Sequence, residues 1–111
     1  MLAQFTVYPM DETHLSKDVA QMMQILDRED VKYCLGPMGT AVEGNWEHVM
    51  SAIRSCHDEM LKHHARVITT ITIDERKNRP HHLHEIVPVV EELLGHKATQ
   101  DGKSVICSDL Q

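Results

Sequence analysis

The stretch Arg66-Val-Ile-Thr-Thr-Ile-Thr-Ile-Asp74 decides the fold of this 111-residue chain. Nearly all of its residues are β-branched, which favours an extended strand over a helix. Alternate side chains of a strand point to opposite faces. One face carries Val67, Thr69, Ile71 and Ile73, and the other carries Ile68, Thr70, Thr72 and Asp74. The sequence therefore predicts a strand over residues 66–74 with one apolar and one mixed face.

A second alternating stretch lies near the start of the chain, at residues 2–9. Its apolar face carries Ala3, Phe5 and Val7, and its semi-polar face carries Gln4, Thr6 and Tyr8. Pro9 cannot donate a hydrogen bond to a sheet, so it ends the predicted strand. Residues 10–14 are polar and are predicted to form a loop.

Two stretches carry apolar residues at helical spacing. The first predicts a helix over about residues 17–29, and the second predicts a helix that follows Asn45 and runs to about residue 63. Ser16 and Asn45 are the expected N-caps, and Asp18 and Glu47 are acidic residues of the two first turns. The first stripe consists of Val19, Met22, Met23 and Leu26. The second consists of Trp46, Val49, Met50, Ile53, Cys56, His57 and Met60.

The remaining elements are shorter. Strands are predicted at residues 31–35 and 40–43, joined by a turn at residues 36–39. A third helical stripe runs from Leu83 to Leu94, where Pro88 is expected to kink or restart the helix and Gly95 to end it. The tail, residues 96–111, is either a loose end or one short extra strand around residues 105–107.

The order strand–helix–strand–strand–helix–strand–helix predicts an α+β fold, a ferredoxin-like sandwich with an added C-terminal helix. We expect residues 1–95 to form one domain and residues 96–111 to form a C-terminal tail. Right-handed crossovers place both main helices on one face of the sheet. The other face would carry Gln4, Thr6, Tyr8, Ile68, Thr70 and Thr72. Because this face is too apolar to suit water well, we expect a second subunit to cover it.

The charge balance excludes some classes of partner. The formal net charge is −6, which argues against nucleic acid and against an anionic membrane surface. No apolar run is long enough to span a membrane, and no signal peptide is visible. The three cysteines, Cys34, Cys56 and Cys107, form no Cys-x-x-Cys pair. The sequence therefore predicts reduced thiols and a cytoplasmic protein.

No catalytic constellation is apparent in the sequence. The histidine-rich segments, His81-His82-x-His84 and His63-His64, have no acidic or thiol ligand at a diagnostic spacing, so ordinary surface histidines are favoured over a metal site. Cys56 falls on the buried stripe of a helix, where a cysteine is usually an inert apolar residue. No nucleophile elbow, phosphate loop or dinucleotide fingerprint is present.

The segment Gly36-Pro-Met-Gly-Thr-Ala-Val-Glu-Gly44 has the most unusual composition. Three glycines within nine residues permit a close approach of a ligand to the backbone. On physical grounds alone, an ordinary glycine-rich hairpin between two strands is favoured over a ligand site. Asp74-Glu75-Arg76 is a second polar candidate, and an ordinary polar loop after a strand is again favoured.

At four places the sequence resembles the family of small thiamine-binding proteins with the YkoF-like fold. The segment Pro37-Met-Gly-Thr-Ala-Val-Glu-Gly44, followed by Trp46, is the most specific. The others are Phe5-Thr-Val-Tyr-Pro9, Leu15-Ser-Lys-Asp-Val19 and Thr69-Thr-Ile-Thr-Ile-Asp-Glu-Arg76. The resemblance covers residues 1–94. It implies ferredoxin-like subunits that associate through their sheets, often into a homotetramer, and that bind thiamine or its hydroxymethylpyrimidine moiety without catalysis or a further cofactor.

The resemblance implies a ligand site built from the quoted segments. Glu43 is the first candidate, because a carboxylate can accept charge-assisted hydrogen bonds from an aminopyrimidine. Tyr8 or Trp46 could stack on the ring. The further candidates are Thr40, Met38, Thr6, Ser16, Asp74 and Arg76. Thr40 and Glu43 are three residues apart and face opposite sides of a regular strand, so a bulge or a site shared by two subunits would have to join them.

Two classes of function are therefore compatible with the sequence. The leading hypothesis is a carrier or sensor of thiamine or its pyrimidine half. The alternative is a structural or regulatory homo-oligomer that acts through a protein partner without retained ligand binding. A metal-dependent enzyme that uses the histidines is a distant third. The absence of an obvious phosphate cradle argues weakly against thiamine diphosphate as the ligand.

Overall fold

The computed structural model describes residues 1–11, 15–78, 86–98 and 106–107. Its elements are β1 (Leu2–Pro9), α1 (Ser16–Arg28), β2 (Lys32–Leu35), β3 (Thr40–Glu43), α2 (Trp46–His63), β4 (Val67–Asp74), α3 (Ile86–Leu94) and β5 (Ile106–Cys107). The sheet order is β4-β1-β3-β2-β5, and every adjacent pair is antiparallel. The predicted ferredoxin-like α+β fold is confirmed, with β5 as an additional edge strand.

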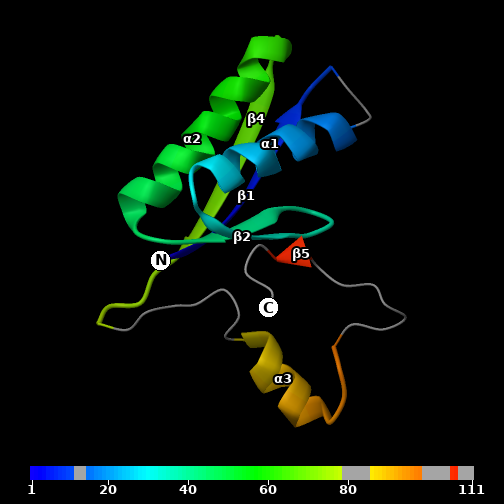
Figure 1. The fold of residues 1–111 in the computed structure, drawn as a ribbon, viewed down its shortest axis with the longest axis vertical. Coiled ribbons are helices and arrows are strands. Elements are labelled where there is room, and N and C mark those ends of the chain that lie inside the picture. The colour runs from blue at the N-terminus through cyan, green and yellow to red at the C-terminus, as the bar shows by residue number, and fades with distance from the viewer. Residues whose placement is uncertain (12–14, 79–85, 99–105, 108–111) are drawn as a thin grey trace.

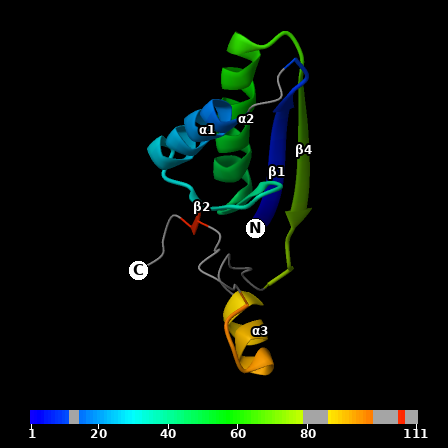
Figure 2. The ribbon, with the colours of Figure 1, turned by 90° about the vertical axis from the view of Figure 1, so that its right-hand side faces the viewer.

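The two long helices lie on one side of the sheet (Figures 1 and 2). Figure 2 shows β1 and β4 edge-on, with α1 and α2 on one side and nothing on the other. In the β1–β4 pairing, Gln4 lies opposite Thr72, Thr6 opposite Thr70 and Tyr8 opposite Ile68. These six residues are the predicted uncovered face, which we call the outer face. Tyr8 and Ile68 are each about two-fifths exposed there.

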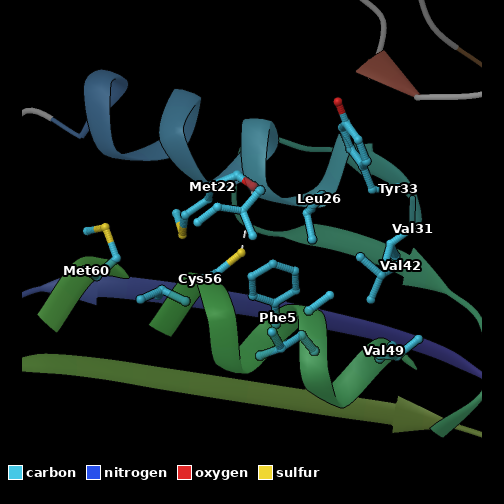
Figure 3. Packing of buried hydrophobic residues seen from close by; sticks show 14 residues of the cluster. Phe5, Met22, Leu26, Val31, Tyr33, Val42, Val49, Cys56 and Met60 are labelled. Atoms are coloured by element: carbon cyan, nitrogen blue, oxygen red, sulfur yellow. Dashed lines mark hydrogen bonds between the residues drawn. The ribbon is translucent and has the colours of Figure 1, made fainter. Parts of the chain in front are cut away.

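The core lies between the helices and the inner face of the sheet (Figure 3). Ala3, Phe5 and Val7 are all buried, as the alternation of β1 predicts. The largest fully buried side chains are Leu26, Ile53, Met60, Val42, Val49 and Cys56. The two helical stripes seen in the sequence thus supply most of the apolar layer that covers the sheet.

Cys56 is an inert part of this core. Its thiol donates to the Met22 carbonyl oxygen at 3.7 Å, drawn as a dashed line in Figure 3. Burial, together with the negative charge of Glu29, raises the pKa of the thiol to about 12. The thiolate is therefore negligible at neutral pH, which is incompatible with a nucleophilic role.

The prediction of reduced thiols is wrong for Cys34, which is disulfide-bonded. The backbone of Cys34 in β2 lies opposite that of Cys107 in β5. The odd number of cysteines and the absence of a Cys-x-x-Cys pair hid this arrangement, because pairing depends on strand register and not on spacing in the sequence.

Helix ends differ in how well the sequence predicts them. Asn45 caps α2 as expected, since its side chain accepts a hydrogen bond from the His48 backbone N–H at 2.8 Å. The prediction of Ser16 as the cap of α1 is wrong: Leu15 occupies that position without a side-chain hydrogen bond, and Ser16 is the first helical residue.

The last helix, α3, stands apart from the rest of the fold (Figures 1 and 2). Pro88 lies in the first turn of the described helix, where the missing N–H costs no helical hydrogen bond. Gly95 follows its end with a φ of 81°, a conformation that favours glycine. Leu83 and the histidines at 81, 82 and 84 lie outside the described residues. Among the described residues, no helix is long and apolar enough to cross a membrane.

The core supplies a direct test of the fold. Leu26 is completely buried on α1, and Leu26→Ala should lower the free energy of unfolding by about 2–5 kcal/mol because it removes apolar contacts and leaves a cavity. Gln24 is exposed on the same helix, so Gln24→Ala should change it by less than about 0.5 kcal/mol. Urea unfolding measures both values. Equal effects of the two variants would contradict the assigned helix face.

Candidate ligand-binding site

The candidate site lies where β1 and β3 cease to pair, a gap in the sheet that we call the fork. β1 pairs with β4 along its whole length, from Leu2 to Pro9. Its pairing with β3 stops at Phe5, which lies opposite Thr40. Thr40 is the first residue of β3, and residues 36–39 before it form the turn that joins β2 to β3. In this turn the Gly36 N–H donates to the Gly39 carbonyl oxygen at 2.9 Å. The second half of β1 therefore has no strand partner on its β3 side within the described residues.

A cavity of about 600 Å³ lies at this fork. Its walls are the second half of β1, the turn between β2 and β3, and the first half of α1 with the residue before it. The lining residues are Phe5, Thr6, Val7, Tyr8, Leu15, Ser16, Val19, Ala20, Met22, Met23, Leu35, Gly36, Pro37, Met38, Gly39 and Thr40. Its volume falls within the range that small-molecule sites usually have.

Gly39 sets the width of the fork. A Cβ atom at this position would lie 3.1 Å from Nε2 of Gln4 and 3.2 Å from Cγ2 of Thr6. The turn therefore rests directly on β1, at a distance that only a residue without a side chain permits without displacement. The glycine-rich segment thus has a packing role in addition to any role in contacting a ligand.

The chemistry of the cavity is mixed apolar and hydroxyl. Phe5 and Tyr8 supply aromatic rings, and three methionines supply polarisable sulfur atoms that adapt to a ligand's shape. The hydroxyl groups come from Thr6, Tyr8, Ser16 and Thr40. No charged side chain is among the described residues that line it. Such a cavity suits a planar, largely uncharged heteroaromatic group with a few hydrogen-bonding atoms.

The structure brings together five of the nine predicted site residues. Thr6, Tyr8, Ser16, Met38 and Thr40 all line the cavity. Thr40 is the one buried polar residue in the described part of the chain, with 5% of its surface exposed. A threonine that lines a cavity can offer its hydroxyl to a ligand as a hydrogen-bonding partner.

The other four predicted residues do not line the cavity. Glu43 lies at the far end of β3, opposite Leu2, and Asp74 lies opposite Leu2 on its other side. Three residues of strand, about 10 Å, separate Glu43 from Thr40. Trp46 begins α2 and is half-exposed, and Arg76 follows β4.

The predicted conflict between Thr40 and Glu43 is real. The pairing of β3 with β1 runs through these residues in unbroken register, without a bulge that would turn Glu43 toward the cavity. Within one chain the carboxylate is therefore no part of this cavity. A site shared between subunits stays a prediction.

Sequence reasoning missed the wall that α1 contributes. Val19, Met22 and Met23 were assigned to the apolar stripe of a core helix, and Met22 is indeed buried. The same stripe continues beyond Thr40, where β3 begins, and there it faces the cavity instead of a strand. The signal that was available is the mismatch in length between the eight-residue β1 and the four-residue β3.

A histidine between two carboxylates lies beside the cavity-lining segment of residues 15–16. His64 follows α2, and its Nδ1 lies 2.9 Å from Oδ1 of Asp11 while its Nε2 lies 3.3 Å from Oδ2 of Asp18. Burial lowers the pKa of His64, but hydrogen bonds to Asp18 and Asp11 and their negative charges outweigh burial and raise it above its ordinary value of 6.5. The His64 ring thus links the end of α2 to Asp11, which precedes α1, and to Asp18, which lies in the first turn of α1.

The remaining described histidines also have structural partners. His57 Nδ1 lies 2.6 Å from Oγ1 of Thr69, and His63 Nε2 lies 3.1 Å from Oε2 of Glu59. Among the residues that the structure describes, no group of three or more histidine, cysteine or acidic side chains is placed to hold a metal ion.

Comparison with known proteins gives a consistent family assignment. A family model described as thiamine-binding protein matches residues 3–91. A UPF0045 protein of Methanothermobacter thermautotrophicus is 33% identical over 96 residues, covering 83% of this chain and 97% of that protein. The UPF0045 protein MJ1052 of Methanocaldococcus jannaschii is 26% identical over 94 residues, covering 84% of this chain and 94% of that protein.

Solved structures show the same fold. The crystal structure of MJ1052 superposes with a TM-score of 0.71 at 24% identity and covers 85% of this chain and 94% of that one. A Thermotoga maritima protein with a suggested role in thiamine biosynthesis or salvage gives a TM-score of 0.69 at 21% identity, covering 80% of this chain and 96% of that one.

The His64 contacts predict a pH-dependent contribution to stability. Because the folded state raises the pKa of His64, its stabilising contribution is fully present below pH 6.5 and is lost as pH rises through the raised value. His64→Gln should therefore destabilise the protein more at about pH 6 than at about pH 8.5. Urea unfolding of both proteins at both pH values measures the difference. An equal loss at the two pH values would contradict the ion-pair assignment.

Proposed function

The chain belongs to the family of thiamine-binding proteins, and on this premise we propose that it is a non-catalytic binding protein for thiamine or its hydroxymethylpyrimidine moiety. The cavity at the fork is the proposed site. The observation that carries this proposal is that Met38, Gly39 and Thr40, from the segment most specific for the family, form one wall of the cavity. Thr6, Tyr8 and Ser16, from two other family segments, form the facing walls.

The proposed ligand matches the chemistry of the walls. An aminopyrimidine is planar and presents an amine donor beside ring-nitrogen acceptors. The Thr40, Thr6 and Ser16 hydroxyls can each donate and accept, so they can satisfy both kinds of atom. Tyr8 lies at the outer face and is 41% exposed, so its ring can stack on a ligand that enters from that side. The thioether of Met38 is a further apolar contact.

The positive charge of thiamine resides on its thiazolium ring and not on the pyrimidine. Because the cavity has no charged lining residue among those described, we propose that the pyrimidine enters it and the thiazolium stays toward the rim. There the Tyr8 ring can attract the cation through its π face. The net charge of −6 adds a general attraction for a cationic ligand.

The assignment as a carrier or sensor, and not an enzyme, rests on what lines the cavity. The polar side chains there are hydroxyls, and no carboxylate, imidazole or thiol among the described lining residues stands beside them to activate one. The buried Cys56 and the paired His57 and His64 lie outside the lining.

We further propose that the working form is a homo-oligomer in which the outer face is covered by another subunit. Tyr8 and Ile68 are exposed at one end of this face, and α3 presents a second exposed apolar surface. These surfaces also favour the second candidate function, a structural or regulatory oligomer that no longer binds a ligand. Ligand titration separates the two candidates.

Isothermal titration calorimetry with thiamine and with hydroxymethylpyrimidine tests the proposed site. Thr40→Val keeps the shape of the side chain but removes its hydroxyl, and it should weaken binding about three- to tenfold, the cost of one neutral hydrogen bond. Glu43→Ala is the matched control, because Glu43 lies on the same strand outside the cavity and its loss should leave binding unchanged.

Each outcome of this titration has a distinct meaning. Loss of binding in Glu43→Ala with full binding in Thr40→Val would overturn the proposed site and return the carboxylate to it, through a second subunit. If the unmodified protein binds neither compound at millimolar concentration, the binding function itself is refuted and the oligomeric candidate takes its place.

A further inference from the structure

We propose that His64 is a positioning residue for the candidate site: its doubly protonated ring holds two walls of the cavity together, and ligand binding weakens as the ring loses a proton. The proposal rests on the proposed function for the identity of the ligand. It adds a dependence on pH near neutrality that the hydroxyl groups of the lining do not supply. His64 lies outside the lining and acts through Asp11 and Asp18.

The two carboxylates belong to different walls of the cavity. Asp11 follows β1, whose second half carries the lining residue Tyr8. Asp18 lies in the first turn of α1, directly before the lining residue Val19. The end of α2, the end of β1 and the start of α1 lie at one end of the molecule (Figures 1 and 2). At this end, the His64 ring links the β1 wall to the α1 wall through its two nitrogen atoms.

The ring is supported from the α2 side. The backbone N–H of His64 donates to the carbonyl oxygen of Met60, a fully buried residue of α2, at 3.0 Å. The side chains of His64 and Asp18 are only 11% and 14% exposed, whereas that of Asp11 is 56% exposed. The contact with Asp18 is therefore largely shielded from water, where the loss of a hydrogen bond is more costly than at the surface.

Only the doubly protonated ring satisfies both contacts. A neutral imidazole carries one N–H, so its other ring nitrogen presents a lone pair. Because each nitrogen of His64 has a carboxylate within 3.3 Å, that lone pair would face a negatively charged oxygen of Asp11 or Asp18. Loss of a proton therefore replaces one attraction with a repulsion and releases one of the two walls from α2.

The charges around the ring favour the protonated form. The two aspartates face it from the segment after β1 and from α1. On α2, His63 and Lys62 are turned to Glu59, at 3.1 Å and 3.4 Å, and Arg66, before β4, is exposed. Burial lowers the pKa of His64, but the hydrogen bonds and charges of the aspartates outweigh it and raise the pKa above 6.5. The ring is thus charged at pH 6 and loses its charge as pH rises through that raised value.

Calorimetric titration of hydroxymethylpyrimidine at pH 6 and pH 8.5 tests this role. We expect binding to weaken with pH about three- to tenfold more in the unmodified protein than in His64→Gln, the cost of one hydrogen bond. The ligand's own titration is common to both proteins and cancels in this comparison. His63→Gln is the matched control, because His63 is an exposed neighbour paired with Glu59, and it should keep the pH dependence of the unmodified protein.

Asp18→Asn separates positioning from general support of the fold. An asparagine amide can donate to the neutral ring nitrogen while the other nitrogen still donates to Asp11. Asp18→Asn should therefore lose the pH dependence and at pH 8.5 bind within about threefold of the unmodified protein at pH 6. If His64 merely stabilised the fold, this variant would show no such rescue.

Thiamine in the same titrations distinguishes positioning from charge at a distance. If the ring acted through its charge alone, its deprotonation would strengthen the binding of the cationic ligand and leave the pyrimidine without a thiazolium unchanged. Positioning of the walls predicts instead that both ligands bind more weakly as pH rises.

NMR spectroscopy of the unliganded protein gives a readout that does not require binding. The backbone amide signals of Tyr8 and Val19, one on each wall, should shift with pH at the midpoint of the His64 ring titration. The shifts should disappear in His64→Gln and persist in His63→Gln.

Three results would each overturn the role of His64: wall signals that do not follow its titration, His64→Gln with the unmodified pH dependence of binding, or thiamine binding that tightens as pH rises while pyrimidine binding stays constant. Absence of binding by the unmodified protein at both pH values would refute the proposed function instead, and the amide signals alone would then decide whether His64 is coupled to the walls.

Discussion

The unequal pairing of β1 is the constraint on which the rest of this structure depends. β1 is bonded to β4 over eight residues but to β3 over four, because the chain turns back at Gly36–Gly39. α1 must nevertheless cover the whole inner face, so its first half spans a fork instead of a continuous sheet. The cavity follows from this geometry and not from any single residue. Gly39 lets the turn pack closely against the Gln4 and Thr6 side chains of β1, because it has no Cβ atom.

The sequence predicts the elements well because each carries its own periodic signal. β4 is recognisable from its β-branched run and β1 from its alternation, and the order of elements restricts the topology to a ferredoxin-like sheet. The site is only half predictable. Thr40 and Glu43 fall in one motif, yet a strand puts them on opposite faces, and no local pattern reveals that Leu15 and Val19 of a distant segment face the same cavity as Thr40. The disulfide at Cys34 was missed for the same reason, since it depends on a contact between strands that are distant in the sequence.

The single chain leaves its apolar surface incompletely covered. α3 has nine residues, and Ile86, Val87, Val89, Val90, Leu93 and Leu94 are exposed on it. These six occupy one side of the helix, with Glu91 and Glu92 flanking them. An isolated helix of this length is marginal in water, so its stability has to come from packing. Together with the outer face, α3 is an exposed apolar surface of the kind that the proposed homo-oligomer would cover.

β1 contributes residues to the core, to the cavity and to the outer face. Phe5 and Val7 anchor it in the core, Thr6 and Tyr8 contribute to both the cavity and the outer face, and its other edge aligns β4. A subunit that packs on the outer face would therefore meet Tyr8 at the rim of the cavity, and a ligand beneath that rim would be enclosed by both copies. The two edges of β1 thus differ: the edge toward β3 is only half paired, which leaves room for the cavity, and the edge toward β4 is paired along its whole length, which holds the strand in place.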